Sequence, residues 1–215
     1  MLLKTSNSKL YTQGYKPKIS IKEVSYIRNQ LLNTILKSAP EKVVDTNIFA
    51  VMTKRRSTRK FLKKHVPAPK VDKIIAAADT APTVGNFQGF EIFYIRSPKK
   101  KKALVKACNN QPYVDAPVVL VFCKNPSRIK MKFPANILKK FAIQDAALAA
   151  AYAQLTAHAL GLSSIWIGMF DEKQVMDVIG TDLVPTSVLC IGYPQQTKHP
   201  KRRRNLKELV HVVWD

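Results

Sequence analysis

Apolar positions recur at helical spacing near the start of the chain, ahead of its main body. Ser20-Ile21-Lys22-Glu23 fits a capping box, in which a glutamate follows the capping residue by three positions. Behind this box, apolar residues recur every three or four positions until Ser38-Ala39-Pro40. The pattern predicts an amphipathic helix over about 20–38, whose apolar face must pack on the main domain or on a second subunit.

The chain ahead of this helix, residues 1–18, is polar and contains no acidic residue. An acid-poor start that contains Ser and Lys is one feature of organelle transit peptides, although Arg is missing from it. Two interpretations stay open: a packed N-terminal extension over 1–44, and a targeting segment within 1–18. We expect the packed extension and a cytoplasmic protein.

From residue 45 onward, helical and strand-like patterns alternate without an internal repeat, which predicts one mixed α and β domain over 45–215. The predicted helices cover about 46–54, 69–79, 99–108, 141–160 and 171–179. The predicted strands cover 90–95, 118–123, 163–167 and 188–193. Residues 125–140 carry mixed charge and two prolines, so we expect a loop there.

The predicted helix over 141–160 is rich in alanine and carries apolar residues around most of its circumference. This pattern indicates burial on most sides, because an amphipathic surface helix has only one apolar stripe. Two interpretations fit: a central core helix, or a core helix that also builds a dimer interface.

Composition limits the class of protein. A hydrophobic fraction of 46% over 215 residues suffices for one core. The sequence contains no run of eighteen apolar residues, so we expect no transmembrane helix. The three cysteines lack CxxC spacing and are predicted to be reduced and structural, as in a cytosolic protein. The four histidines are scattered, so no metal site is expected.

The chain is strongly basic, with 36 Lys and Arg against 14 Asp and Glu and a net charge of +22. Such a charge attracts polyanions, including nucleic acid. No zinc finger, RNA-recognition motif or basic zipper accompanies it. We therefore expect a lysine-rich solvated surface and no specific nucleic-acid partner, with a basic nucleic-acid-binding module as the alternative.

Several common catalytic fingerprints are missing from the sequence. GxGxxG and GxxxxGK[ST] do not occur, so the usual signatures of dinucleotide and P-loop binding are absent. GxSxG and HExxH are absent too, which removes the usual support for a hydrolase or a zinc peptidase.

Two basic clusters lie near the two ends of the main domain, with a polar loop between them. The clusters are Arg55-Arg56-Ser57-Thr58-Arg59 and Lys201-Arg202-Arg203-Arg204, and the loop is Ala81-Pro82-Thr83-Val84-Gly85-Asn86-Phe87-Gln88. Guanidinium groups bind phosphate through a planar fork of donors. Amide side chains offer donors and acceptors to a planar heterocycle. Together these segments predict a site for a phosphorylated aromatic cofactor, whereas one cluster alone would indicate only a solvated face.

The motif Arg55-Arg56-Ser57-Thr58-Arg59-Lys60-Phe61 resembles the opening motif of the FMN-dependent nitroreductases, and residues 81–88 are similar to that family's Ala-Pro-Ser-x-x-Asn-x-Gln segment. The stretch from Asp145 through Gly161-Leu162 to Ser164-Ile165-Trp166-Ile167-Gly168 resembles its central helix and following strand. Ile191-Gly192-Tyr193-Pro194 and the 201–204 cluster match its C-terminal end. The four motifs occur in the family's order over about 46–215, and residues 1–44 lie outside the resemblance.

The resemblance implies an α+β fold with a mainly antiparallel sheet flanked by helices, and an obligate homodimer with two FMN sites at its interface. Arg55, Arg56, Ser57 and Arg59 would hold the phosphate, ribityl chain and pyrimidine edge, and Lys201 and Arg203 would complete the phosphate site. Pro82, Thr83, Val84 and Asn86 would come from the other subunit and meet the flavin ring. The backbone near Gly168 would reach flavin N5, and Asn109 or Asn110 would add a polar contact.

The implied activity is hydride transfer from NAD(P)H through FMN to a small-molecule electron acceptor, in a ping-pong cycle without a side-chain nucleophile or base. Nitroaromatics, quinones or free flavins are the expected acceptors. The same fold also serves dehalogenation and flavin fragmentation, and a flavin-binding protein without turnover is a further alternative. The chain has Thr83 where Ser is common, Gly89-Phe90 where Pro-Trp is frequent, and a short 125–140 segment that should line the acceptor pocket.

Overall fold

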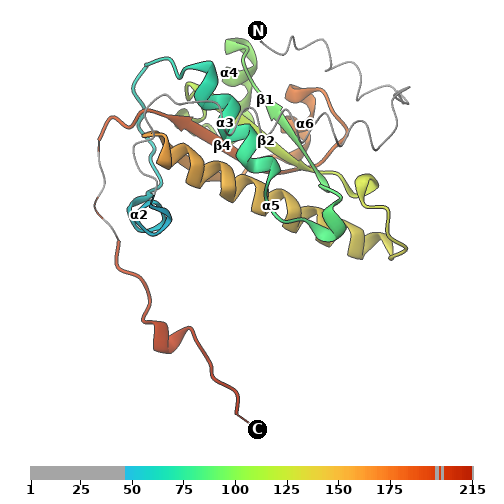
Figure 1. Ribbon diagram of the computed structural model, residues 1–215. Helices are drawn as coiled ribbons and strands as arrows, with labels where there is room; N and C mark the ends of the chain where they lie inside the picture. Colours follow the sequence, from blue (N-terminus) through green and yellow to red (C-terminus); the bar gives the residue numbers. More distant parts are fainter. Residues whose placement is uncertain (1–46, 197–198, 200, 215) are drawn as a thin grey trace.

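The computed structural model describes residues 47–196, 199 and 201–214 (Figure 1). The predicted N-terminal extension over 1–44, with its helix over 20–38, therefore lies outside the described residues. The helices are α2 (Ile48–Lys54), α3 (Ala68–Asp79), α4 (Pro98–Ala107), α5 (Ala135–Ala159) and α6 (Glu172–Ile179). The strands are β1 (Phe90–Tyr94), β2 (Val118–Lys124), β3 (Ser163–Ile167) and β4 (Pro185–Gly192). Short 3-10 turns occur at η2 (Val84–Asn86), η3 (Pro112–Val114), η4 (Pro126–Arg128) and η5 (Leu206–Glu208).

The four strands form one sheet in the order β1-β2-β4-β3, and every neighbouring pair is antiparallel. The register places Val121 opposite Val188 in the central pair. The α+β class with a mainly antiparallel sheet, expected from the sequence, is confirmed.

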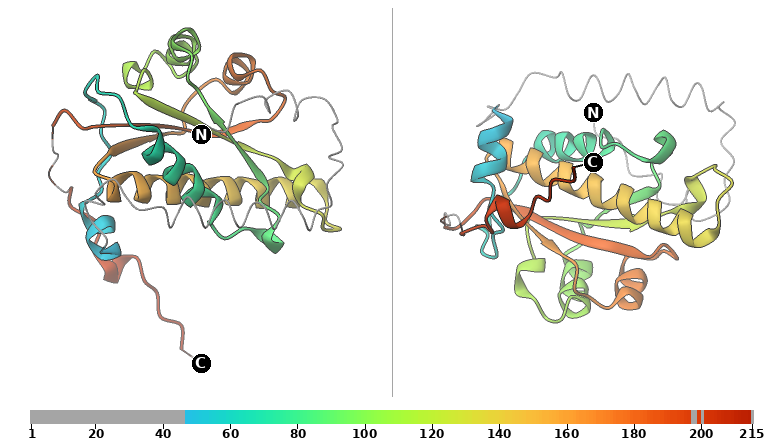
Figure 2. Two further views of the ribbon diagram at one scale, coloured as in Figure 1. Left: turned by 45° about the horizontal axis from the view of Figure 1, so that its top comes forward. Right: turned by 90° about the horizontal axis from the view of Figure 1, so that it is seen from below.

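Two cores lie on the two faces of this sheet, because successive side chains of a strand point to opposite sides. Along β2, Val118, Leu120 and Phe122 join the core beneath α3 and α5, whereas Val119 and Val121 join the core beneath α4 and α6. Figure 1 and Figure 2 show this three-layer arrangement. A strand covered on both faces needs apolar residues at consecutive positions, which explains the unbroken apolar run of β2.

Two element boundaries differ from the predictions. Helix α5 begins at Ala135 and not near 141, so the connecting loop ends at Pro134. The lysines at 139 and 140 suggested a loop, but they lie on the exposed side of the helix, while Ile137 and Leu138 are half-buried. Strand β4 begins at Pro185 and not at 188, because pairing with Cys123 of β2 orders residues that show no apolar run.

Helix α5 is buried on one side only within a single chain. Its alanines face the sheet and α3, namely Ala142, Ala146, Ala149, Ala150, Ala153 and Ala157. Ile143, Leu148 and Tyr152 are exposed. Among the described residues, the expected burial on most sides is therefore not seen, and one side of α5 is exposed.

The three cysteines are buried and unpaired, as expected of structural thiols. Burial raises the pKa of the Cys108 thiol to about 11 and that of Cys123 to about 12, so both stay protonated near neutral pH. In the part of the chain that the structure describes, no helix is both long and apolar enough for a bilayer, and no group of His, Cys, Asp or Glu is arranged to hold a metal ion.

Candidate functional site

The first basic cluster is an extended segment that leaves the end of α2 and runs beside β3. Asn47 begins α2 by accepting hydrogen bonds from the backbone N–H groups of Phe49 and Ala50 at 3.0 and 3.2 Å. Beyond the helix, Thr58 N donates to the Ser164 carbonyl at 3.0 Å. Thr58 is buried, whereas its neighbours Ser57 and Arg59 are exposed, as alternation in an extended chain requires. The fold therefore presents Ser57 and Arg59 to solvent on a fixed backbone.

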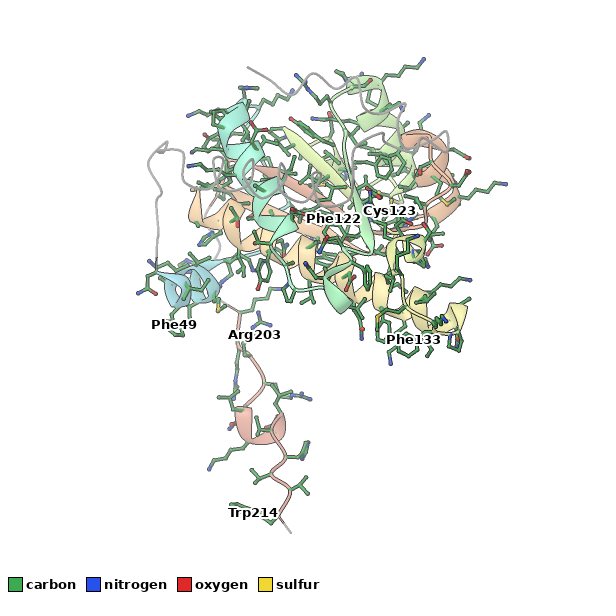
Figure 3. The ribbon with its side chains drawn as sticks, turned by 45° about the vertical axis from the view of Figure 1, so that its right-hand side comes forward. Phe49, Phe122, Cys123, Phe133, Arg203 and Trp214 are labelled. Carbon is green, nitrogen blue, oxygen red and sulfur yellow. The ribbon has the colours of Figure 1, made fainter. Side chains whose placement is uncertain are left out.

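The second basic cluster approaches the first through Arg203. The pKa of the Arg55 guanidinium is lowered, first by burial and then by the positive charges of Arg203 and Arg56. Figure 3 shows Arg203 at the base of the C-terminal segment, close to α2. The structure thus brings together two clusters that are far apart in sequence, as a shared anion would require. Their roles as phosphate ligands stay predictions.

Arg56 is partly used by the chain itself. Its Nη1 donates to the carbonyls of Thr53 and Arg55 at 2.5 and 2.7 Å, at the C-terminal end of α2, where a positive charge is favourable. Its Nε is buried without a hydrogen-bond partner among the described residues. A buried unpaired donor costs free energy, so an acceptor oxygen supplied by a ligand would stabilise this position.

The polar loop over 82–88 is held from α5. Asp145 is 2% exposed, and its two carboxylate oxygens accept hydrogen bonds from the N–H groups of Val84 and Gly89, each at 3.0 Å. Proline at 89 could not make this bond, which explains physically why Gly89 suits this chain. A Cβ at 89 would also lie 3.0 Å from the carboxylate.

Inside the loop, Gln88 fixes the shape of the exposed tip. Its Nε2 donates to the carbonyl and side-chain oxygens of Asn86, both at 2.6 Å, while its N–H donates to Thr83 Oγ1 at 3.2 Å. The threonine found in place of serine therefore keeps the hydroxyl that this contact needs. Gly85 adopts φ 51°, and a Cβ there would lie 2.6 Å from the Phe87 ring. Pro82 and Asn86 are exposed, and Thr83 and Val84 are half-buried.

The first basic cluster and the extended chain that follows it (residues 55–62, the basic segment) lie at the opposite end of the sheet from the polar loop over 82–88 within one chain. The loop leads into Phe90, which pairs with Lys124 at one end of β2. The basic segment instead contacts Ser164 and Tyr193, beside the strand ends that pair with the start of β2. At roughly 3.3 Å per residue, the length of β2 separates them by roughly 20 Å. One chain therefore does not assemble both halves of the predicted site.

Gly168 follows β3 directly and is exposed. A Cβ at this position would have only Trp166 Nε1 nearby, at 3.9 Å, so the backbone is open to close approach by a ligand. The neighbouring Met169 carbonyl accepts a hydrogen bond from Gln111 Nε2 at 3.3 Å. The Tyr113 hydroxyl in turn donates to Gln111 Oε1, and the Arg59 guanidinium lies 5.8 Å from the centroid of the Tyr113 ring.

Sequence reasoning missed the structural roles of Asp145 and Gln111. Asp145 marked only the start of a family-like helix, although a lone carboxylate on an alanine-rich apolar helix is a signal for a buried polar anchor. Gln111 had no signal of this kind, because its partner lies 58 positions away.

Lys201, the other predicted phosphate-site residue of the second basic cluster, is exposed.

The fold is that of an α+β protein whose four antiparallel strands lie between two helical layers. The nitroreductase family model matches residues 52–193, and the chain belongs to the nitroreductase family. A protein of Methanothermobacter thermautotrophicus, named as an NADH dehydrogenase or NAD(P)H nitroreductase, is 29% identical over 165 residues, covering 72% of this chain and 81% of that protein.

Two further relatives extend the comparison. An NAD(P)H FMN reductase of Bacillus subtilis is 27% identical over 176 residues, covering 74% of this chain and 71% of that protein. The solved structure of the NADPH:FMN oxidoreductase of Vibrio harveyi in complex with NAD⁺ superposes with a TM-score of 0.73 at 25% identity, covering 78% of this chain and 77% of that chain.

Proposed function

We propose that this chain is an FMN-dependent NAD(P)H oxidoreductase that reduces nitroaromatic, quinone or flavin-type acceptors. Family membership and the relatives named for FMN and NAD(P)H support the cofactor and the electron donor. The observation that carries the proposal is the approach of Arg203 to Arg55. No acidic residue occurs between residues 46 and 71 to neutralise this cluster. Two guanidinium groups that approach each other suit a phosphate.

The residues present fit FMN in three respects. Arg55 and Arg203 provide charge for the phosphate, and the buried Nε of Arg56 offers a donor without a partner among the described residues. Exposed Ser57 and Arg59 lie on the same fixed segment, within reach of polar groups beyond the phosphate. Lys201 belongs to the same C-terminal segment as Arg203 and would add to the positive field.

Bound FMN would supply the hydride-transfer chemistry between NAD(P)H and the acceptor, and the two substrates would use the site in turn. The protein itself would bind and orient the cofactor and would exclude water from the site. The open backbone at Gly168 would allow close approach by the cofactor, and the loop held by Asp145 would contribute Pro82, Thr83, Val84 and Asn86 to the site.

We infer that the active form is a homodimer, because a second copy would bring its loop over 82–88 to the basic segment of the first. The exposed apolar residues of α5 support this inference. So does the C-terminal segment over 201–214, which extends away from the domain (Figures 1 and 2). Within one chain Val213 is 91% exposed and Trp214 is 85% exposed. Apolar surface on this scale needs a covering partner.

Light scattering checks the assembly. We expect about twice the 24.2 kDa chain mass, since a symmetric dimer is the simplest closed assembly that completes both sites. A monomer that retains full affinity for FMN would contradict the inferred arrangement.

The acceptor class follows from apolar side chains beside the loop. Met131 lies in the short connection between β2 and α5, and its Sδ would be 3.6 Å from a Cβ at Gly85. Phe133 is exposed and packs edge-to-face on Phe141 with centroids 5.9 Å apart. Exposed aromatic and thioether groups favour planar aromatic acceptors. The buried unpaired cysteines suit the reducing cytoplasm, which we propose as the location.

The experiment is spectroscopic. Purified protein should show oxidised-flavin absorption, and heat should release FMN and not FAD. Under anaerobic conditions, NADH or NADPH should bleach the flavin absorption. An added quinone or nitroaromatic should then restore it. A colourless protein that takes up no FMN would disprove the proposal. Bleaching without acceptor turnover would indicate a flavin-binding protein, and product analysis would reveal dehalogenation or flavin fragmentation.

A further inference from the structure

We propose that Gln111 and Tyr113 are positioning residues that hold the segment over 168–170 in register with the basic segment. This inference rests on the proposed function, in which the backbone near Gly168 faces the reacting edge of FMN. Neither residue needs to touch the cofactor. Their effect would pass through the Met169 carbonyl.

In the segment over 168–170, the Phe170 side chain packs against the core beneath α4 and α6, so the part of the segment without packed side chains is Gly168 and Met169. Met169 is 72% exposed, so its side chain anchors little. Two hydrogen bonds instead tie the segment to the end of α4: Gln111 Nε2 donates to the Met169 carbonyl at 3.3 Å, and Asp171 N donates to the Ala107 carbonyl at 2.9 Å. The second bond lies next to α6, so the Gln111 bond is the nearer of the two to Gly168 in sequence.

Tyr113 fixes which way the Gln111 amide points. Because the Tyr113 hydroxyl donates to Oε1, the NH₂ group must face the Met169 carbonyl. Asn109 and Asn110 precede Gln111 with φ values of 54° and 56°, a left-handed conformation that costs free energy outside glycine. This tight turn directs Gln111 toward the 168–170 segment.

The same tyrosine connects to the basic segment. Arg59 lies over the Tyr113 ring, 5.8 Å from its centroid, and a guanidinium over an aromatic face is attracted to it. Arg59, Tyr113, Gln111 and Met169 therefore form a continuous chain of contacts from the cofactor-anchoring segment to the backbone beside Gly168. Hydride transfer is sensitive to displacements of about 1 Å, so this chain of contacts would set its rate without setting phosphate affinity.

Two substitutions test the inference with a matched control. Gln111→Met keeps the length of the side chain and removes both hydrogen bonds, while Tyr113→Phe removes only the hydroxyl and keeps the ring under Arg59. Gln174→Met is the control, because Gln174 Nε2 bonds only Asp171 Oδ2 at 3.0 Å within its own helix cap. All three variants are measured beside the unmodified full-length protein.

We expect anaerobic flavin reduction by NADPH to slow about tenfold or more in Gln111→Met and about threefold in Tyr113→Phe. The FMN dissociation constant should stay within about threefold of the unmodified protein in both, since the phosphate contacts remain. Hydrogen exchange should quicken at the amides of residues 168–170 in both variants, with or without FMN. The control should change none of these quantities.

Unchanged reduction rates and unchanged amide exchange in both variants would overturn the inference. Loss of FMN affinity equal to the loss of rate would also overturn it, because Gln111 would then be a cofactor ligand. A failure of the proposed function looks different, since the unmodified protein itself would then bind no FMN. The exchange measurement on cofactor-free protein would still report whether Gln111 anchors the segment.

Discussion

Replacing Arg55 or Arg203 with alanine is expected to weaken FMN binding about tenfold to a hundredfold, because a hydrogen bond to a charged group contributes roughly 1.5–3 kcal/mol. The pKa of Arg55 is lowered first by burial and then by the positive charge of Arg203, so the two residues approach each other although they repel. Removing Arg203 therefore relieves an unfavourable contact in the cofactor-free protein. We expect its melting temperature without FMN to be unchanged or raised, while the stabilisation gained on adding FMN falls.

Fluorescence titration of cofactor-free protein with FMN measures the effect. Arg96→Ala, which removes an exposed arginine just before the N-cap of α4, is the control and should leave the titration unchanged. Arg55→Lys should give an intermediate loss, since lysine keeps the charge but lacks the planar fork of donors. Unaltered titrations in both alanine variants would show that the phosphate binds elsewhere.

Replacing Asp145 with leucine is expected to lower the free energy of unfolding by roughly 2–5 kcal/mol, since two backbone N–H groups would lose their acceptor and each unsatisfied buried group costs roughly 1–3 kcal/mol. Val84 N and Gly89 N are those donors. The loop between them would also lose its fixed shape, so FMN affinity should fall although Asp145 is not placed against the cofactor.

Urea denaturation followed by circular dichroism measures this loss. Asp177→Asn, on the exposed side of α6, is the control and should alter stability by no more than about 0.5 kcal/mol. Asp145→Asn should fall between the two, because an amide can accept from one N–H group but turns its own donors toward the other. Wild-type stability in the leucine variant would mean that the loop is held by other contacts.

A strand was predictable where its own residues carry a strand pattern. The apolar run over 118–123 indicated a strand buried on both faces, and β2 has that environment. The start of β4 was not predictable in this way, because Pro185 and Thr186 join the sheet only through their pairing with β2, where Thr186 Oγ1 also donates to the Phe122 carbonyl at 3.0 Å.

The candidate site was predictable in its composition and not in its geometry. Two arginine clusters with a polar loop between them predicted an anion site, since the donor chemistry lies in the side chains themselves. The separation of the two halves depends on strand register, which places Phe90 and Ser163 at opposite ends of the sheet. The alternation of apolar and polar residues along a strand does not reveal how neighbouring strands are aligned, so it cannot reveal that separation. The contact between Gln111 and Met169 depends likewise on how α4 packs on α6.

In the proposed dimer, the C-terminal segment would serve both cofactor binding and subunit association. Arg203 lies at its base beside Arg55, and the exposed apolar residues from Leu206 to Trp214 follow within a few positions. Ordering one end of the segment would restrict the other, so that FMN binding and subunit association would be thermodynamically linked and reciprocal. We then expect FMN retention to depend on protein concentration: dilution that separates the subunits would also release FMN, and excess FMN would favour the dimer.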